Sequence, residues 1–147
     1  MRDKIERLKE LSLCGKPEAI FEFERILVEL GKDQRIEILK ELFSVFDDRC
    51  QDTNMLYSLT HVVERFPDEI YLKTLVLGIC DMGRSDMRWL KFLFYRILND
   101  PPSYSSFKKF VREPDPSLLT SFLNKINQES PEHRQQVEEL KQIIGSK

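Results

Sequence analysis

Apolar residues recur at three- and four-residue steps along almost the whole chain, a spacing that places them on one face of an α-helix. The segment 20–30 is typical, because its apolar stripe consists of Ile20, Phe23, Ile26, Leu27 and Leu30. No alternating apolar segments flank an Asn-Gly or Asp-Gly turn, the usual signal of a hairpin of strands. The sequence therefore predicts an all-α protein.

Glycine, proline and aspartate interrupt these stripes and divide the chain into about nine helices. Four of the helices have candidate N-terminal caps, which are Asp33, Asp52 or Thr53, Ser85 and Ser117. Short connections favour antiparallel helix hairpins, stacked as in HEAT repeats or packed as an irregular helical bundle. At 147 residues, the chain fits one all-helical domain spanning residues 1–147.

Composition and the amino-terminal segment indicate a soluble protein. Apolar residues make up 41% of the chain and charged residues 33%, as expected of an ordered and well-solvated protein. No segment approaches the roughly 18 consecutive apolar residues of a membrane span. The first ten residues, MRDKIERLKE, lack the apolar centre of a signal peptide. We therefore expect a cytoplasmic protein that makes no contact with a membrane.

Residue patterns that carry catalysis or bind a cofactor are scarce. The segment GRSDM lacks the second glycine of a nucleophile elbow, so Ser85 is better explained as a helix cap. His61 and Glu64 lie three residues apart on one helix face, but no third catalytic group accompanies them. We interpret His61 as a structural histidine inside or at the rim of the fold. No catalytic residue, cofactor or small-molecule substrate is expected.

A metal site is not expected either. The three cysteines, Cys14, Cys50 and Cys80, are far apart in sequence, and the chain has only two histidines. We interpret the cysteines as reduced, small apolar residues. The aspartates of segment 47–52 lack the ligand spacing and central glycine of an EF-hand loop, so they are expected to lie in a solvated loop.

Charge is distributed unevenly along a chain whose formal net charge is −2. Residues 47–86 carry eight acids against four bases, and residues 87–125 carry seven bases against three acids. The basic segment YSSFKKFVR contains Lys108, Lys109 and Arg112, but its aromatic residues have the spacing of a helix core. We therefore expect no nucleic-acid partner, and an acidic surface suited to a basic protein.

The segment WLKFLFYRILND, residues 89–100, predicts a helix that is apolar on most sides and lies in the middle of the protein. A buried guanidinium needs a partner, so Arg96 is expected to pair with a carboxylate, and Glu64 is the first candidate. The alternative is that Arg96 extends along the surface and keeps its charge in water.

The segment LYSLTHVVERF, followed by a tyrosine in the next helix and then by WLKFLFYRILND, resembles the bacterial immunity protein 30 family. The residues that carry the resemblance are Leu59, His61, Glu64, Trp89, Arg96, Ile97, Leu98 and Asn99. The resemblance implies a cytoplasmic, non-catalytic protein that binds and blocks a cognate toxin domain, often the C-terminal effector of a contact-dependent growth inhibition system. It also implies that His61, Glu64, Trp89, Arg96 and Asn99 are structural.

Contact with such a toxin would fall on exposed positions. If the toxin is a nuclease with a basic groove, an acidic surface would complement it. The candidates are the carboxylates at two inter-helix turns, namely Asp47, Asp48, Asp52, Asp68 and Glu69. One alternative function is a helical-repeat adaptor for another protein. A nucleic-acid-binding or catalytic helical domain is a further alternative.

Overall fold

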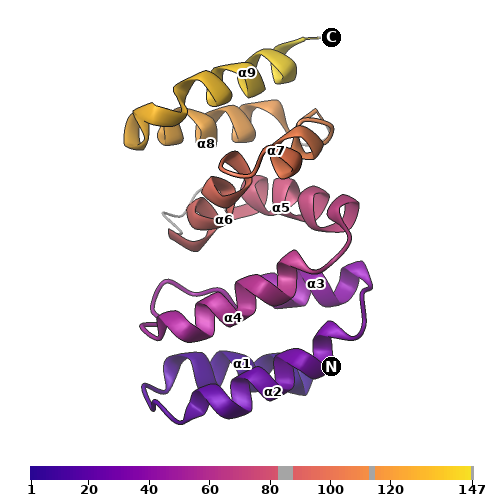
Figure 1. The fold of residues 1–147 in the computed structure, drawn as a ribbon, viewed down its shortest axis with the longest axis vertical. Helices are drawn as coiled ribbons and strands as arrows, with labels where there is room; N and C mark the ends of the chain where they lie inside the picture. The colour runs from indigo at the N-terminus through magenta and orange to yellow at the C-terminus, as the bar shows by residue number, and fades with distance from the viewer. Residues whose placement is uncertain (83–87, 113–114, 147) are drawn as a thin grey trace. The chain divides into compact units, whose positions relative to one another are not determined.

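The computed structural model describes residues 1–82, 88–112 and 115–146 of the chain, and these residues fold into helices without a strand (Figure 1). The all-α prediction is confirmed. None of the described helices is both long enough and apolar enough to cross a membrane. In chain order the helices are α1 (Arg2–Leu13), α2 (Ala19–Gly31), α3 (Ile36–Phe43), α4 (Thr53–Glu64), α5 (Asp68–Met82), α6 (Arg88–Leu98), α7 (Pro101–Phe107), α8 (Pro116–Glu129), the 3-10 turn η1 (Pro131–His133) and α9 (Arg134–Gly145).

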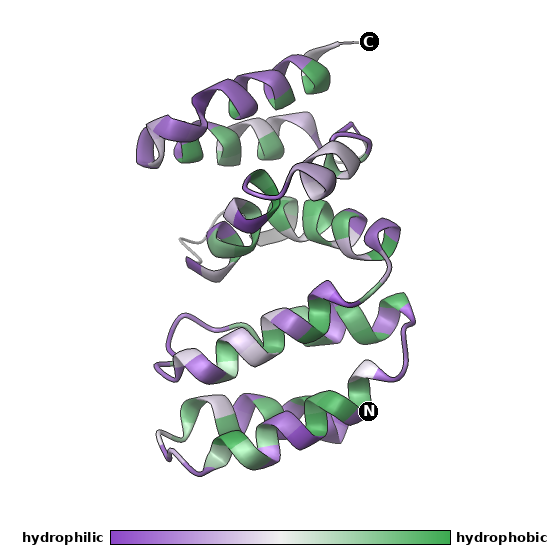
Figure 2. Ribbon diagram, in the orientation of Figure 1, coloured by the Kyte–Doolittle hydropathy of each residue, from purple (hydrophilic) through white to green (hydrophobic). Residues whose placement is uncertain are grey.

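The chain divides into two compact units, Met1–Tyr71 and Leu72–Lys147, and the division falls inside α5. Each unit has its own buried side chains. Along most of the helices hydrophobic and hydrophilic residues alternate with the helical period, whereas α5 is hydrophobic along most of its length (Figure 2). A single domain spanning residues 1–147 stays a prediction.

In the first unit, α1 and α2 pack as an antiparallel hairpin. Two ion pairs fix their relative direction, because Lys4 near the start of α1 meets Glu29 near the end of α2 (3.0 Å), and Arg7 meets Glu22 one turn further along (2.8 Å). The turn between the two helices contains Gly15, whose φ of 72° lies in the left-handed region that favours glycine. The antiparallel hairpin predicted from the short connections is therefore present.

Helix α4 packs beside α2, and the two helices run in the same direction. The hydroxyl of Ser58 donates to Glu24 (2.9 Å), and further along the pair a Cβ placed on Gly31 would lie 3.3 Å from Cγ1 of Val62. Helix α3 also packs on α4. The fully buried large side chains of this unit are Ile5, Leu8, Phe23, Leu27, Leu39, Leu42, Met55, Leu56 and Leu59, with Phe66 after α4.

In the second unit, Phe94 of α6 forms an aromatic cluster with Phe107 of α7 and Phe122 of α8. The ring centroids lie 5.8 Å and 5.2 Å from that of Phe94, both in edge-to-face geometry. Phe94 and Phe107 are completely buried. Helices α8 and α9 pack against each other. The cluster therefore connects three helices of this unit.

Aspartates cap several helices, and the observed caps differ in part from the expected ones. Asp52 accepts hydrogen bonds from the backbone of Asn54 and Met55 at the start of α4, as predicted. The cap of α8 is Asp115 rather than Ser117, because Pro116 already occupies the first turn and Asp115 accepts from the backbone of Ser117. Asp33 does not cap α3, since its carboxylate instead binds the side chain and backbone of Arg35.

Asp100 is a further cap that was not among the expected ones, and it precedes α7, whose first turn contains the two prolines that follow α6. The predicted cap Ser85 lies outside the described residues.

Candidate functional site

The loop before α4 contains three of the five carboxylates that the sequence places in a contact surface. Asp47, Asp48 and Asp52 are all half-buried. Asp47 accepts hydrogen bonds from the side chain and backbone of Arg49, at 2.8 Å and 2.9 Å, and the Arg49 guanidinium holds the pKa of Asp47 below its ordinary value. Asp47 and Asp52 therefore also shape the loop, the first through Arg49 and the second as the cap of α4.

Asp68 and Glu69 form the second group, and both are exposed in the first turn of α5. Helix α4 separates them from the loop, since it begins after Asp52 and ends at Glu64. A helix of its 12 residues is about 18 Å long, at a rise of about 1.5 Å per residue. The two acidic groups therefore lie at opposite ends of α4.

The loop that carries Asp47, Asp48 and Asp52, which we call the acidic loop, lies beside the turn that precedes α2. A small groove of about 240 Å³ is lined by Gly15, Lys16 and Pro17 from that turn and by Gln51, Asp52 and Met55 from the start of α4, together with Leu11 and Ser12. The starts of α2 and α4 therefore lie at the same edge of the first unit.

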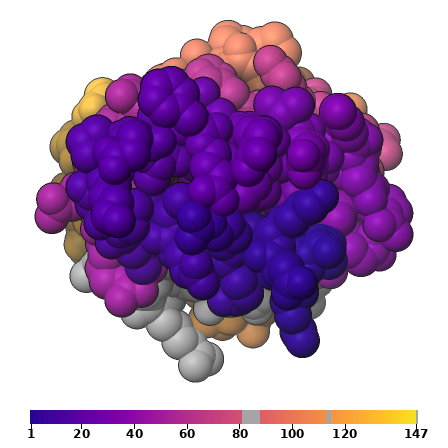
Figure 3. Space-filling view, turned by 90° about the horizontal axis from the view of Figure 1, so that it is seen from below, coloured from indigo at the N-terminus to yellow at the C-terminus, as the bar shows by residue number. Residues whose placement is uncertain are grey.

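The same unit exposes large apolar side chains that are not among the contact residues predicted from the sequence. Phe21 is 75% exposed, Val28 59% and Tyr57 44%. A helical wheel would have shown that Phe21 and Val28 lie opposite the buried stripe of α2, but exposure of Tyr57 depends on which neighbours cover α4. Side chains of α1 and α2 (indigo and violet) dominate the face seen in Figure 3.

The five residues that the resemblance implies to be structural, which we call the signature residues, occupy several environments. His61 is exposed on α4, so it lies at the rim rather than in the interior, and Glu64 is half-buried. Trp89 is half-buried rather than central, and its ring lies 5.3 Å from that of Phe92 in edge-to-face geometry. The guanidinium of half-buried Arg96 lies over the Phe92 ring, 5.7 Å from its centroid.

The structure therefore brings Trp89 and Arg96 together on Phe92. A pair between Glu64 and Arg96 stays a prediction. Asn99 is exposed, and its amide oxygen lies 3.0 Å from Nε2 of His133.

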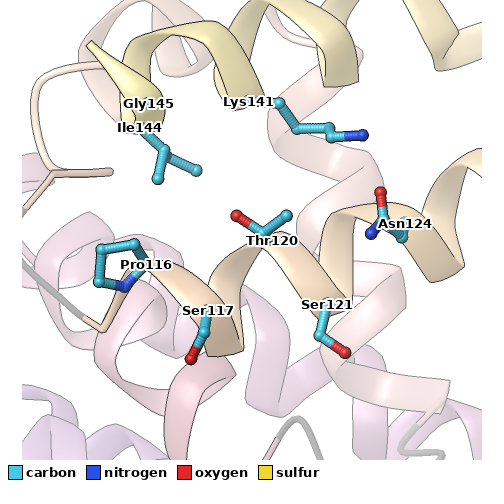
Figure 4. Close-up of a pocket in the computed structure, with 8 residues that line it drawn as sticks. All are labelled: Pro116, Ser117, Thr120, Ser121, Asn124, Lys141, Ile144 and Gly145. Atoms are coloured by element: carbon cyan, nitrogen blue, oxygen red, sulfur yellow. The ribbon is translucent and has the colours of Figure 1, made fainter.

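A more open groove of about 590 Å³ lies along α8 and α9 (Figure 4). Thr120 and Ile144 lie in the space between the two helices, while Ser117 and Ser121 point away from α9. Lys141 pairs with Glu138 at 3.6 Å. The lining contains the hydroxyls of Ser117, Thr120 and Ser121 and the ammonium of Lys141.

The remaining expectations concern metals and thiols. Within the described ranges, no three His, Cys, Asp or Glu side chains gather in an arrangement that could hold a metal ion. Cys50 and Cys80 are free and buried, as expected of small apolar residues, and burial raises the pKa of the Cys50 thiol. Cys14 is also free but exposed, so the expectation of an apolar core position is wrong for this residue.

Comparison with known proteins gives one match. The family model described as immunity protein 30 matches residues 10–107, about two thirds of the chain. The match includes α2, α4 and α6 and ends with α7. No curated protein and no solved structure is similar enough to match.

Proposed function

Because the chain belongs to the immunity protein 30 family, we propose that it binds a cognate toxin domain and neutralises it by occlusion, without catalysis. The family match is the observation that carries this proposal. The proposed partner is the C-terminal domain of a contact-dependent growth inhibition toxin, and its proposed activity is that of a nuclease with a basic groove. The proposed place of action is the cytoplasm of the cell that makes the toxin.

The charge of the first unit supports a basic partner. Residues 1–71 contain sixteen acidic and eleven basic side chains, whereas residues 72–147 contain nine acidic and twelve basic ones. The first unit thus has a formal charge of −5 and the second +3. Opposite charge accelerates association, because it steers the encounter of two proteins.

Within the first unit, the loop that carries Asp47, Asp48 and Asp52 is the primary candidate for contact with the toxin. Asp68 and Glu69, at the other end of α4, form a second candidate. The loop ranks first because it adjoins the start of α2 and so belongs to a broader surface. Asp47 and Asp52 keep fixed positions through their hydrogen bonds, which limits the entropy that they lose when a partner binds.

The proposal predicts a toxin gene beside the gene for this chain, and the direct test is to express its toxin domain with and without the chain. We expect the toxin to stop growth alone and growth to resume when the chain is present. Purified chain should also bind a catalytically inactive form of the toxin domain. Growth arrest that persists in the presence of well-folded chain, together with no binding, would contradict the proposed function.

A second experiment tests the loop. The triple variant Asp47→Asn, Asp48→Asn and Asp52→Asn removes three charges, and asparagine preserves the capping ability of residue 52. We expect slower association with the toxin and a weaker dependence of the association rate on salt. The comparison variant, Asp68→Asn with Glu69→Gln, removes charge at the second candidate group and should slow association less than the triple variant does. Equal association rates for the wild type and the triple variant would exclude the loop.

A further inference from the structure

We propose that the toxin-binding surface continues from the acidic loop onto the outward face of α2 and α4, where Phe21 and Tyr57 are its apolar anchors. This inference rests on the proposed function, because its occupant is the cognate toxin domain. It specifies the partner as a protein surface with an apolar pocket bordered by lysine or arginine side chains.

The exposure of Phe21 is the first argument. Core contacts of α2 are made by Phe23, Ile26, Leu27 and Leu30, whereas Phe21 and Val28 lie seven residues apart on the opposite side. Phe21 is 75% exposed, so its ring contributes little to the core and leaves most of its apolar surface in water. Aromatic side chains that are exposed in the free protein are common centres of protein interfaces.

The arrangement of α2 and α4 brings Tyr57 onto the same face. Ser58 binds Glu24, and Gly31 lies close to Val62, so the two helices run side by side in one direction. Tyr57 is 44% exposed and lies about 100° around α4 from Ser58, on the side away from the buried residues Leu56, Leu59 and Val63. Phe21, Val28 and Tyr57 therefore form the apolar part of one two-helix surface, which we call the α2–α4 face.

This face is continuous with the acidic loop. The groove that joins Pro17 to Asp52 places the starts of α2 and α4 at one edge. Phe21 lies in the first turn of α2, and Tyr57 lies in the second turn of α4, close to that edge. A partner that binds the loop is therefore close to both rings.

Charges around Phe21 indicate the chemistry of the partner. Glu18 and Glu24 lie three residues before and after Phe21, and both are exposed. Arg25 is also exposed nearby, but it interacts electrostatically with Glu22 and Glu29 of its own helix. An aromatic ring between two carboxylates complements an apolar pocket with a basic rim. That pattern agrees with the net charge of −5 on the first unit.

The decisive variants are Phe21→Ala and Tyr57→Ala, measured by calorimetry with an inactive form of the toxin domain encoded beside this gene. We expect at least one of them to weaken binding about thirtyfold or more, the hot-spot range of interface residues. Leu13→Ala is the matched control, because Leu13 is 40% exposed in the same unit but belongs to α1. That control should bind within about threefold of the wild type, a change of well under 1 kcal/mol.

All three variants should unfold at the temperature of the wild type, because substitutions of exposed residues change stability little. Wild-type affinity in both Phe21→Ala and Tyr57→Ala would overturn the inference and leave the proposed function standing. No binding by the wild-type chain would overturn both. Glu18→Gln with Glu24→Gln should slow association, and an unchanged rate would contradict the basic rim.

A second copy of the chain is the competing occupant of the α2–α4 face. Light scattering of the wild-type chain alone, over a range of concentrations, distinguishes it from the toxin. We expect a monomer mass throughout. A dimer that Phe21→Ala converts into a monomer would show that this face binds another copy, and would overturn the toxin as its occupant.

Discussion

His133 faces Asn99, with Nε2 of the imidazole 3.0 Å from the amide oxygen, and so links the end of α6 to the start of α9. The other ring nitrogen, Nδ1, lies 2.7 Å from the hydroxyl of Ser130. Gln136 strengthens the link by donating to the carbonyl of Leu98 (2.8 Å). The family match ends at residue 107. Asn99 lies inside the matched segment, and its partner His133 lies beyond the end of that segment.

Asn99→Ala should destabilise the second unit, because it removes the hydrogen bond to His133. We expect a loss of about 1 kcal/mol, the usual net contribution of one hydrogen bond. Chemical denaturation would measure it. Asn124→Ala is the matched control, since Asn124 is exposed on α8 of the same unit, and it should change stability by less than about 0.5 kcal/mol. Equal stabilities of the two variants would contradict a structural role for the Asn99–His133 pair.

Phe94→Ala should be far more damaging than Trp89→Ala, although tryptophan is the larger residue. Phe94 is completely buried between Phe107 and Phe122, so truncation should cost about 3–5 kcal/mol. Trp89 is half-buried, so part of its side chain is already in water and its truncation should remove less buried contact. Thermal unfolding of both variants would test this order. A larger loss for Trp89→Ala would show that Trp89 is central, as the sequence alone suggests.

Asp52 should have two separable roles, one in folding and one in binding. Asp52→Ala removes the acceptor for Asn54 and Met55 and should cost about 0.5–2 kcal/mol. Asp52→Asn retains a capping acceptor and should leave stability close to that of the wild type. If the proposed surface is correct, the asparagine variant still associates more slowly with the toxin. Equal stability losses in the two variants would mean that the charge, and not the cap, stabilises α4.

Tyr104 should make stability depend on pH in the alkaline range. Burial and the hydrogen bond to Glu139 raise the pKa of Tyr104 above its ordinary value. The folded state therefore holds the phenolic proton more tightly than the unfolded state does. This contribution to stability is fully present below about pH 10, the unfolded pKa, and is lost as pH rises through the folded pKa. Denaturation measured on either side of pH 10 should show a smaller loss for Tyr104→Phe than for the wild type.

The same variant tests the partner carboxylate. The Tyr104 hydroxyl donates to Glu139, and this hydrogen bond lowers the pKa of Glu139. Tyr104→Phe should therefore raise that pKa towards its ordinary value, as measured by NMR titration of the carboxyl carbon. Tyr57→Phe, an exposed substitution in the first unit, is the control and should leave the titration of Glu139 unchanged.

Helix positions could be predicted well because they depend on local signals. The stripe from Phe23 to Leu30 and the cap at Asp52 both lie within one segment, and each is found as expected. Local competition explains two wrong caps. Asp33 lies two residues before Arg35, whose guanidinium donates hydrogen bonds to both of its carboxylate oxygens. Pro116 occupies the first turn of α8, so Asp115 precedes the helix as its cap.

Contacts between distant segments could not be predicted in the same way. A helical wheel shows that α6 is apolar on most sides, but it does not show which of those sides receives a neighbour. The structure gives Phe94 two aromatic neighbours and leaves Trp89 half-buried. Asn99 and His133 are separated by 34 positions, and nothing in either residue type predicts their contact. The acidic loop of the candidate surface could be predicted from the sequence. The exposure of Tyr57 could be recognised only from the arrangement of α2 and α4 in the structure.

The close approach of Gly31 to Val62 has a consequence for how the family can vary. A methyl group at position 31 would meet Cγ1 of Val62 at 3.3 Å, so α4 would have to move slightly or its side chain would have to become smaller. Substitutions at these two positions should therefore be correlated among relatives. A chain with alanine or serine in place of Gly31 should tend to carry a smaller residue in place of Val62. The spacing of α2 and α4 would then be visible as covariation of these two positions among relatives.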